Sequence, residues 1–160
     1  MAGPPTEEDR TEAIRRLLSG LERGFDAHEL AAAVADLHPK NNTFPGEVFM
    51  EIAADALEIA GISRDASIPY EGLREAHLPE CSFRGRENRK IQYAILTSAA
   101  FRAGLTPDLL DEVAYWNDDY WRYALFATVG LIRAAAARQA ISAAQLARQI
   151  AERHGITDPS

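Results

Sequence analysis

Four basic side chains gather in the stretch 84–90 and offer the chemistry needed to bind an anion. They are Arg84, Arg86, Arg89 and Lys90, and Glu87 is the one acid among them. We expect a helix to begin in this stretch, where free backbone N–H groups also attract an anion. A plain solvated first turn is the other interpretation, although basic side chains oppose the dipole at a helix start and are mildly unfavourable there. The stretch is therefore the best candidate in this chain for an anionic ligand.

A second group with recognisable chemistry is the aromatic and acidic segment 115–123. It contains both tryptophans of the chain and three of its five tyrosines. Tyr, Trp and Arg are enriched at binding hot spots, so the segment predicts a rim that binds a peptide or a small cationic ligand. Helical spacing favours a different interpretation, in which Trp121, Leu125 and Thr128 share a core-facing side. The predicted partner-binding residues are Tyr115, Trp116, Asp118, Asp119, Tyr120 and Trp121.

Two histidines, His38 and His77, stand before matching loops and are candidates for lining a pocket there. Neutral imidazole ligates metals, and it titrates near neutrality. The chain contains neither a His-Glu-x-x-His nor a Cys-x-x-Cys motif, and Cys81 is its one cysteine, so we expect no metal and no cofactor. Both histidines also have a simpler explanation, which is capping the last carbonyl groups of a helix.

One spacing in the chain is similar to that of a known class of enzyme. The all-helical HEPN nucleases carry an arginine a few residues before a histidine, and both Arg148 to His154 and Arg23 to His28 fit. Two matches in one Arg-rich chain show that this spacing is unspecific. We therefore predict no catalytic residue, and the sequence leaves open whether the protein is an enzyme.

Length and composition fit one soluble domain. The chain has 160 residues, of which 47% are hydrophobic and 26% charged, and its net charge of -7 disfavours nucleic acid and anionic membranes as partners. The N-terminus lacks the pattern of a signal peptide. The longest apolar run, Ala124 to Ile132, is about half of the roughly 20 residues that cross a bilayer. We expect a cytoplasmic protein without a membrane span, and the abundance of Arg and Ala suggests a bacterial source.

Alanine is abundant in the chain and is the strongest helix former, so an all-α fold is expected. Apolar residues at helical spacing and capping residues divide the chain into about eight helices. The first is expected from Thr11 to Gly24, and the second, capped by Asp26, stops before His38. The others are expected at 45–61, 68–77, 86–104, 107–115, 120–138 and, capped by Ser142, 143–154.

Four of these helices end in the same local formula, which is a glycine, an apolar residue and then Ser, Thr or Asp. The glycines are Gly24, Gly61, Gly104 and Gly155. Glycine takes the left-handed position after a helix, and the spacing suits an array of helix pairs. In addition, Asp118 to Leu125 is similar to the Asp-x-x-apolar-Arg start of the second helix in HEAT-type repeats. This resemblance implies a curved stack of helix pairs that presents a surface to a partner, with no catalytic residues.

The expected architecture is a single all-α domain over residues 11–156, between a flexible lead at 1–10 and a tail at 157–160. Four antiparallel helix pairs form a short curved stack, and a closed orthogonal bundle is the alternative. The function expected is that of a protein- or peptide-binding scaffold. The alternative is a small enzyme, or a small-molecule or anion-binding protein, with a pocket near 38–46 and 77–90. The expected core comprises Leu17, Leu30, Val34, Ile52, Leu57, Ile95, Phe101, Leu110, Val113, Leu125, Val129 and Ile150.

Overall fold

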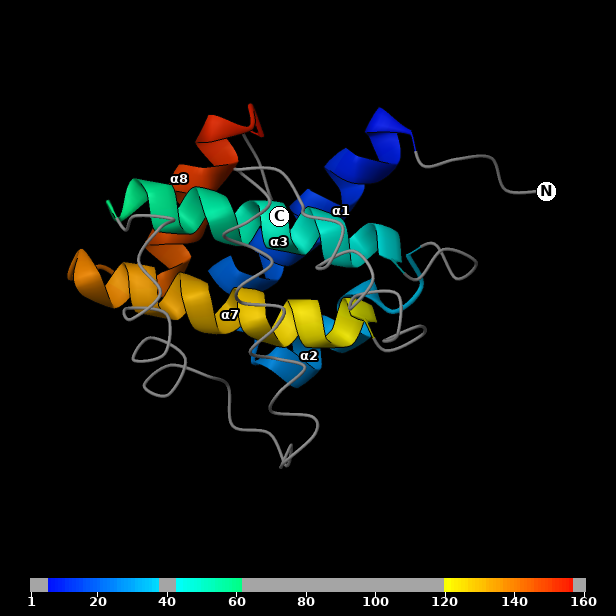
Figure 1. Ribbon diagram of the computed structural model, residues 1–160, viewed down its shortest axis with the longest axis horizontal. Helices are drawn as coiled ribbons and strands as arrows, with labels where there is room; N and C mark the ends of the chain where they lie inside the picture. The colour runs from blue at the N-terminus through cyan, green and yellow to red at the C-terminus, as the bar shows by residue number, and fades with distance from the viewer. Residues whose placement is uncertain (1–5, 38–42, 62–119, 157–160) are drawn as a thin grey trace, which may run out of the picture.

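The computed structural model describes residues 6–37, 43–61 and 120–156, and these ranges contain helices and no strand. This confirms the all-α fold class. The helices expected between residues 68 and 115 lie outside the described residues, so the expected total of about eight is not reached here. The five described helices are α1 (Glu7–Glu22), α2 (Ala27–Val34), α3 (Thr43–Ile59), α7 (Tyr120–Arg138) and α8 (Ala143–Arg153) (Figure 1).

Capping side chains define where three of these helices begin. Asp26 and Ser142 cap α2 and α8 as predicted, and each completes a reciprocal capping box with the side chain three residues later. The first helix begins earlier than expected, because Thr6 and Asp9 form a third capping box. The Asp9 N–H donates to Thr6 Oγ1 at 3.2 Å, and the Thr6 N–H donates to the Asp9 carboxylate at 2.8 Å. The flexible lead predicted through residue 10 is therefore wrong from residue 6 onward.

A residue with left-handed backbone follows each of the helices α1, α3, α7 and α8. Gly24, Gly61 and Gly155 have φ angles of 81°, 72° and 72°, which confirms the conformation predicted for them. Ala140 takes the same position between α7 and α8 with a φ of 56°, and it is the one non-glycine residue with positive φ in the described ranges. The N–H of the following Ile141 donates to the carbonyl five residues earlier at 3.0 Å, as at the corners of Gly24 and Gly155. Because residue 140 is an alanine, the pattern of a glycine after a helix does not predict this left-handed turn.

Replacing Ala140 by glycine is expected to raise the free energy of unfolding by about 1 kcal/mol. Left-handed backbone costs alanine roughly 1–2 kcal/mol more than glycine, and the greater freedom of glycine in the unfolded chain cancels part of the gain. Gly155→Ala is the matched control and should lower stability, since its Cβ would meet no atom within 4 Å and only the φ of 72° matters. Urea titration of both variants measures the effect. An Ala140→Gly protein that is no more stable than the parent would contradict it.

Helices α3 and α7 lie side by side and run in the same direction (Figure 1). One side chain of α7, and one from the residue directly after it, bind backbone carbonyls of α3. The buried Thr128 hydroxyl lies 3.0 Å from the Phe49 carbonyl, and Gln139 Nε2 donates to the Ile59 carbonyl at 2.6 Å. The two residues of the first pair are 79 apart in sequence, and those of the second pair are 80 apart. Because this separation hardly changes along the helices, α3 and α7 are parallel and keep the same register over their length.

The first and last described helices also touch, since α1 packs against α8 and Arg148 binds Glu22 at 2.9 Å. All five helices contribute to one hydrophobic cluster. The ends of an open stack lie apart, so the contact between α1 and α8 differs from the curved stack that the sequence suggested. The expected core residues within the described ranges are confirmed as buried: Leu17, Leu30, Val34, Ile52, Leu57, Leu125, Val129 and Ile150. Ile95, Phe101, Leu110 and Val113 lie outside these ranges.

Within the described residues, no single helix is both long enough and apolar enough to cross a bilayer. Residues 124–138 of α7 and helix α8 meet the length and composition only when they are counted together, and they are bent by 102° where they join.

Candidate functional site

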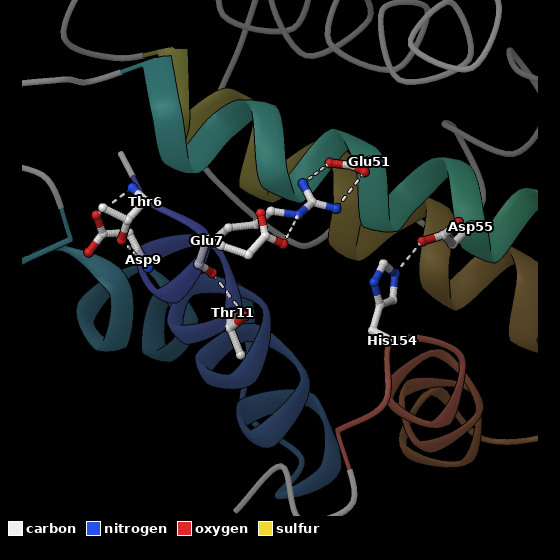
Figure 2. A network of polar contacts seen from close by, with 8 residues as sticks. Thr6, Glu7, Asp9, Thr11, Glu51, Asp55 and His154 are labelled. Carbon is white, nitrogen blue, oxygen red and sulfur yellow. Dashed lines mark hydrogen bonds and ion pairs between the residues drawn. The ribbon is translucent and has the colours of Figure 1, made fainter. Parts of the chain in front are cut away.

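One face of α3 carries three acidic residues, Glu51, Asp55 and Glu58, which we call the α3 acidic row. Their spacing of four and three residues places them on one side of the helix. Figure 2 shows Glu51 and Asp55 on α3, with His154 reaching Asp55 from the end of α8. Each acid binds one basic side chain of a neighbouring helix, and Arg153 Nη2 lies 2.5 Å from Glu58 Oε1. The row therefore ties α1 and α8 to α3.

Arg10 of α1 binds Glu51 through two parallel hydrogen bonds, one of which joins Nη2 to Oε1 at 2.6 Å. Both side chains are about two-thirds buried, with exposed fractions of 27% and 32%. The hydrogen bonds to Glu51 raise the pKa of Arg10 above its usual value, although burial acts the other way. A raised pKa means that this attraction, as long as Glu51 is ionised, is fully present below the usual pKa of arginine and is lost only as the pH rises above that value.

Asp55 and His154 form the most buried pair of the row. The exposed fraction of the Asp55 side chain is 3%, and His154 Nε2 lies 2.6 Å from its Oδ2. A carboxylate beside an imidazole is a familiar acid–base arrangement, but its chemistry requires substrate to reach the ring. Here the ring faces the interior carboxylate from α8. Within the described residues there is also no group of three or more His, Cys, Asp or Glu that could hold a metal ion. The pair is best explained as a packing contact between α8 and α3.

A cleft between α1 and α2 is the described feature best suited to binding. It has a volume of about 250 Å³ and is open to solvent. Its depth depends on Gly20, because α2 approaches α1 so closely that an added Cβ would lie 2.3 Å from Leu30 Cδ2. We call it the α1–α2 cleft, and it is lined by Glu12, Arg15, Arg16, Ser19, Gly20, Arg23, Phe25 and Ala33.

The α1–α2 cleft is positively charged, with three arginines against one glutamate in its lining. Arg16 is held in place, because its guanidinium lies 3.0 Å from Glu12, 2.5 Å from Asp36 and 3.2 Å from the Ala33 carbonyl. These contacts, led by the hydrogen bond to Glu12, raise the pKa of Arg16. Arg15 shares Glu12 at 2.7 Å. For Arg23, no side-chain hydrogen bond or ion pair is found in the described part of the chain.

The spacing along α1 places these groups on one side of the helix. Arg15, Ser19 and Arg23 are each four residues apart, so the Ser19 hydroxyl lies between the two arginines. The opposite side of the same helix carries the buried Ile14, Leu17, Leu18 and Leu21. Only this apolar side was predicted from the sequence, and the basic side of the helix was missed. The helical spacing of the arginines was the available signal in the sequence. Only the fold shows that α2 packs beside them and forms a cleft.

Few of the predicted site residues fall within the described ranges. Trp121 is half-buried in the first turn of α7 and packs against the core cluster. Arg122 is exposed, and its guanidinium carbon lies 5.7 Å from the centre of the Trp121 ring. Leu125 and Thr128 are buried on the same helix, as the core interpretation expects. Tyr120 begins α7, and a binding role for it and Trp121 stays a prediction. The remaining residues lie outside the described ranges: Tyr115, Trp116, Asp118, Asp119, Arg84, Arg86, Arg89, Lys90, His38 and His77.

The HEPN-like spacing does not assemble a site in α8. Arg148 binds Glu22 of α1, whereas His154 binds Asp55 of α3, so the two side chains serve different helix contacts. The other match is also divided, because the His28 ring packs edge-on against Phe126 at 5.5 Å while Arg23 lines the α1–α2 cleft.

Comparison with known proteins adds no family. No family model matches the chain, and no curated protein or solved structure is significantly similar to it.

Proposed function

We propose that this protein is a helical module that binds a protein or peptide partner, and that the α1–α2 cleft receives an acidic group of that partner. The cleft is the observation that carries the proposal. The lining of the cleft has more positive than negative side chains, whereas the whole chain has a net charge of -7. The cleft therefore attracts an acidic segment that the rest of the surface repels. Arginine also binds carboxylates through paired hydrogen bonds, which gives the contact a direction.

The proposed complete domain has about eight helices, three of them between residues 68 and 115. The contact between α1 and α8 supports a closed bundle, the alternative to the HEAT-like stack, because it joins the two ends of the described fold. In such a bundle the partner binds at a local cleft instead of along an extended concave surface. The aromatic segment 115–123 remains a second proposed contact, and residues 120–123 are its described part, with Trp121 packed against the core cluster.

A peptide selection tests the proposed function. The full chain is immobilised and presented with three displayed peptide libraries, which are enriched in acidic, neutral or basic residues. We expect enrichment from the acidic library, and its loss for the double variant R15Q/R23Q, because each change removes a cleft charge while leaving the exposed helix surface in place. Selected peptides are then measured individually by fluorescence anisotropy.

The control is R138Q/R148Q, which removes the same charge from exposed positions outside the cleft. This control variant should bind the selected peptides as tightly as the parent does. Circular dichroism should show the same helix content in both double variants. Failure to select any peptide, or equal binding by R15Q/R23Q and the parent, would overturn the proposed function.

A further inference from the structure

The α1–α2 cleft combines two kinds of lining in a small space. Its lining contains the polar side chains of Arg15, Ser19 and Arg23 and the apolar side chains of Phe25 and Ala33. A volume of about 250 Å³ lies below the roughly 300–1,000 Å³ of small-molecule pockets, so the cleft suits a single residue of a larger ligand. That residue must supply both a negative charge and an apolar group.

We propose that the cleft binds the C-terminus of a peptide that ends in an apolar residue. The α-carboxylate lies at Ser19 between Arg15 and Arg23, and the last side chain lies against Phe25. This inference rests on the proposed function and specifies its ligand. A C-terminal apolar residue carries its carboxylate and its side chain on one Cα, so one residue satisfies both kinds of lining. An internal Asp or Glu supplies the charge alone, and its apolar neighbour needs further space.

The fixed contacts around the cleft favour a bound carboxylate. Glu12 is already engaged by Arg15 and Arg16, at 2.7 Å and 3.0 Å, so its charge is partly neutralised. Arg16 is occupied by Glu12, Asp36 and the Ala33 carbonyl. Arg23, together with the N–H donors of Arg15 that Glu12 does not use, thus supplies the charge that a ligand meets, and Ser19 supplies a hydroxyl donor from the same side of the helix.

The test uses labelled five-residue peptides and the full chain, with fluorescence anisotropy as the measurement. One peptide ends in leucine with a free carboxylate, a second is its C-terminal amide, and a third carries an internal aspartate and an amidated end. We expect the free carboxylate to bind at least about tenfold more tightly than the amide, because a hydrogen bond to a charged group contributes roughly 1.5–3 kcal/mol. R15Q and R23Q should each weaken binding about tenfold by the same reasoning, S19A by less, and R138Q not at all.

The outcomes separate this inference from the proposed function. If the amide and internal-aspartate peptides bind as well as the free carboxylate, and R15Q/R23Q still abolishes binding, the C-terminal inference is overturned and the acidic-partner function stands. If N-acetyl-leucine binds the parent but not R15Q/R23Q in isothermal titration calorimetry while no peptide binds, the ligand is a small carboxylic acid and both proposals fail. If the free-carboxylate peptide binds R15Q/R23Q as it binds the parent, the cleft is not its site and the inference fails.

Discussion

Replacing His154 by alanine is expected to lower the free energy of unfolding by about 3 kcal/mol, because it removes a close partner of a buried carboxylate. Asp55 is 2% exposed, and the His154 ring nitrogen lies 2.6 Å from its carboxylate oxygen. The loss also removes one of the contacts between the end of α8 and α3, although Arg153 still binds Glu58. Urea denaturation of parent and variant, followed by circular dichroism, measures the change in stability.

His154→Gln is the matched control for this prediction. The glutamine amide nitrogen stands the same number of bonds from the backbone as His154 Nε2, so it can donate to Asp55 in place of the ring. We expect His154→Gln to recover at least half of the stability that His154→Ala loses. Equal loss in the two variants would show that ring packing, and not the contact with Asp55, gives His154 its importance.

Replacing Gly20 by alanine is expected to lower the free energy of unfolding by about 2 kcal/mol, although alanine is the better helix former by roughly 1 kcal/mol. The added Cβ would lie 2.3 Å from Leu30 Cδ2 and 3.1 Å from Phe25 Cδ2. Leu30 is fully buried and has little space into which it can retreat. Thermal and urea unfolding measure the loss, and the same variant should weaken peptide binding because Gly20 and Phe25 line the α1–α2 cleft.

Two further variants isolate the steric cause. Ser19→Ala changes the neighbouring residue of the same helix and should cost far less, since Ser19 is only half-buried. Leu30→Ala removes the atoms that the new Cβ strikes, so the combined G20A/L30A variant should lose less stability than the two single losses added together. Strict additivity would contradict the clash between positions 20 and 30.

Local patterns predicted much of this fold. The limits of α7 were expected at 120–138 and are found there, because a long apolar helix has a clear start and a basic residue at its end. The caps Asp26 and Ser142 are equally local, since each involves residues within one turn. Ala140 escaped prediction because the left-handed corner usually selects glycine, and here the flanking helices impose that backbone on alanine.

Contacts between residues that are distant in sequence could not be predicted from local patterns. Nothing in the residues around Phe49 indicates that Thr128 will touch its carbonyl, because the two are 79 residues apart and their contact depends on how all the helices pack. The α1–α2 cleft is a similar case. Arg15 and Arg23 form an ordinary solvated helix face in the sequence, and they line a cleft only because Gly20 lets α2 approach α1.

The contact between α1 and α8 has a consequence for synthesis of the protein. A chain leaves the ribosome N-terminus first, so the apolar side of α1, with Leu17 and Leu18, emerges long before Leu146 and Ile150 of α8 exist. The common cluster cannot close until α8 is made. Until α8 has been made, the part of α1 that packs against it stays uncovered, although α2 and α3 can already cover the rest of its apolar side.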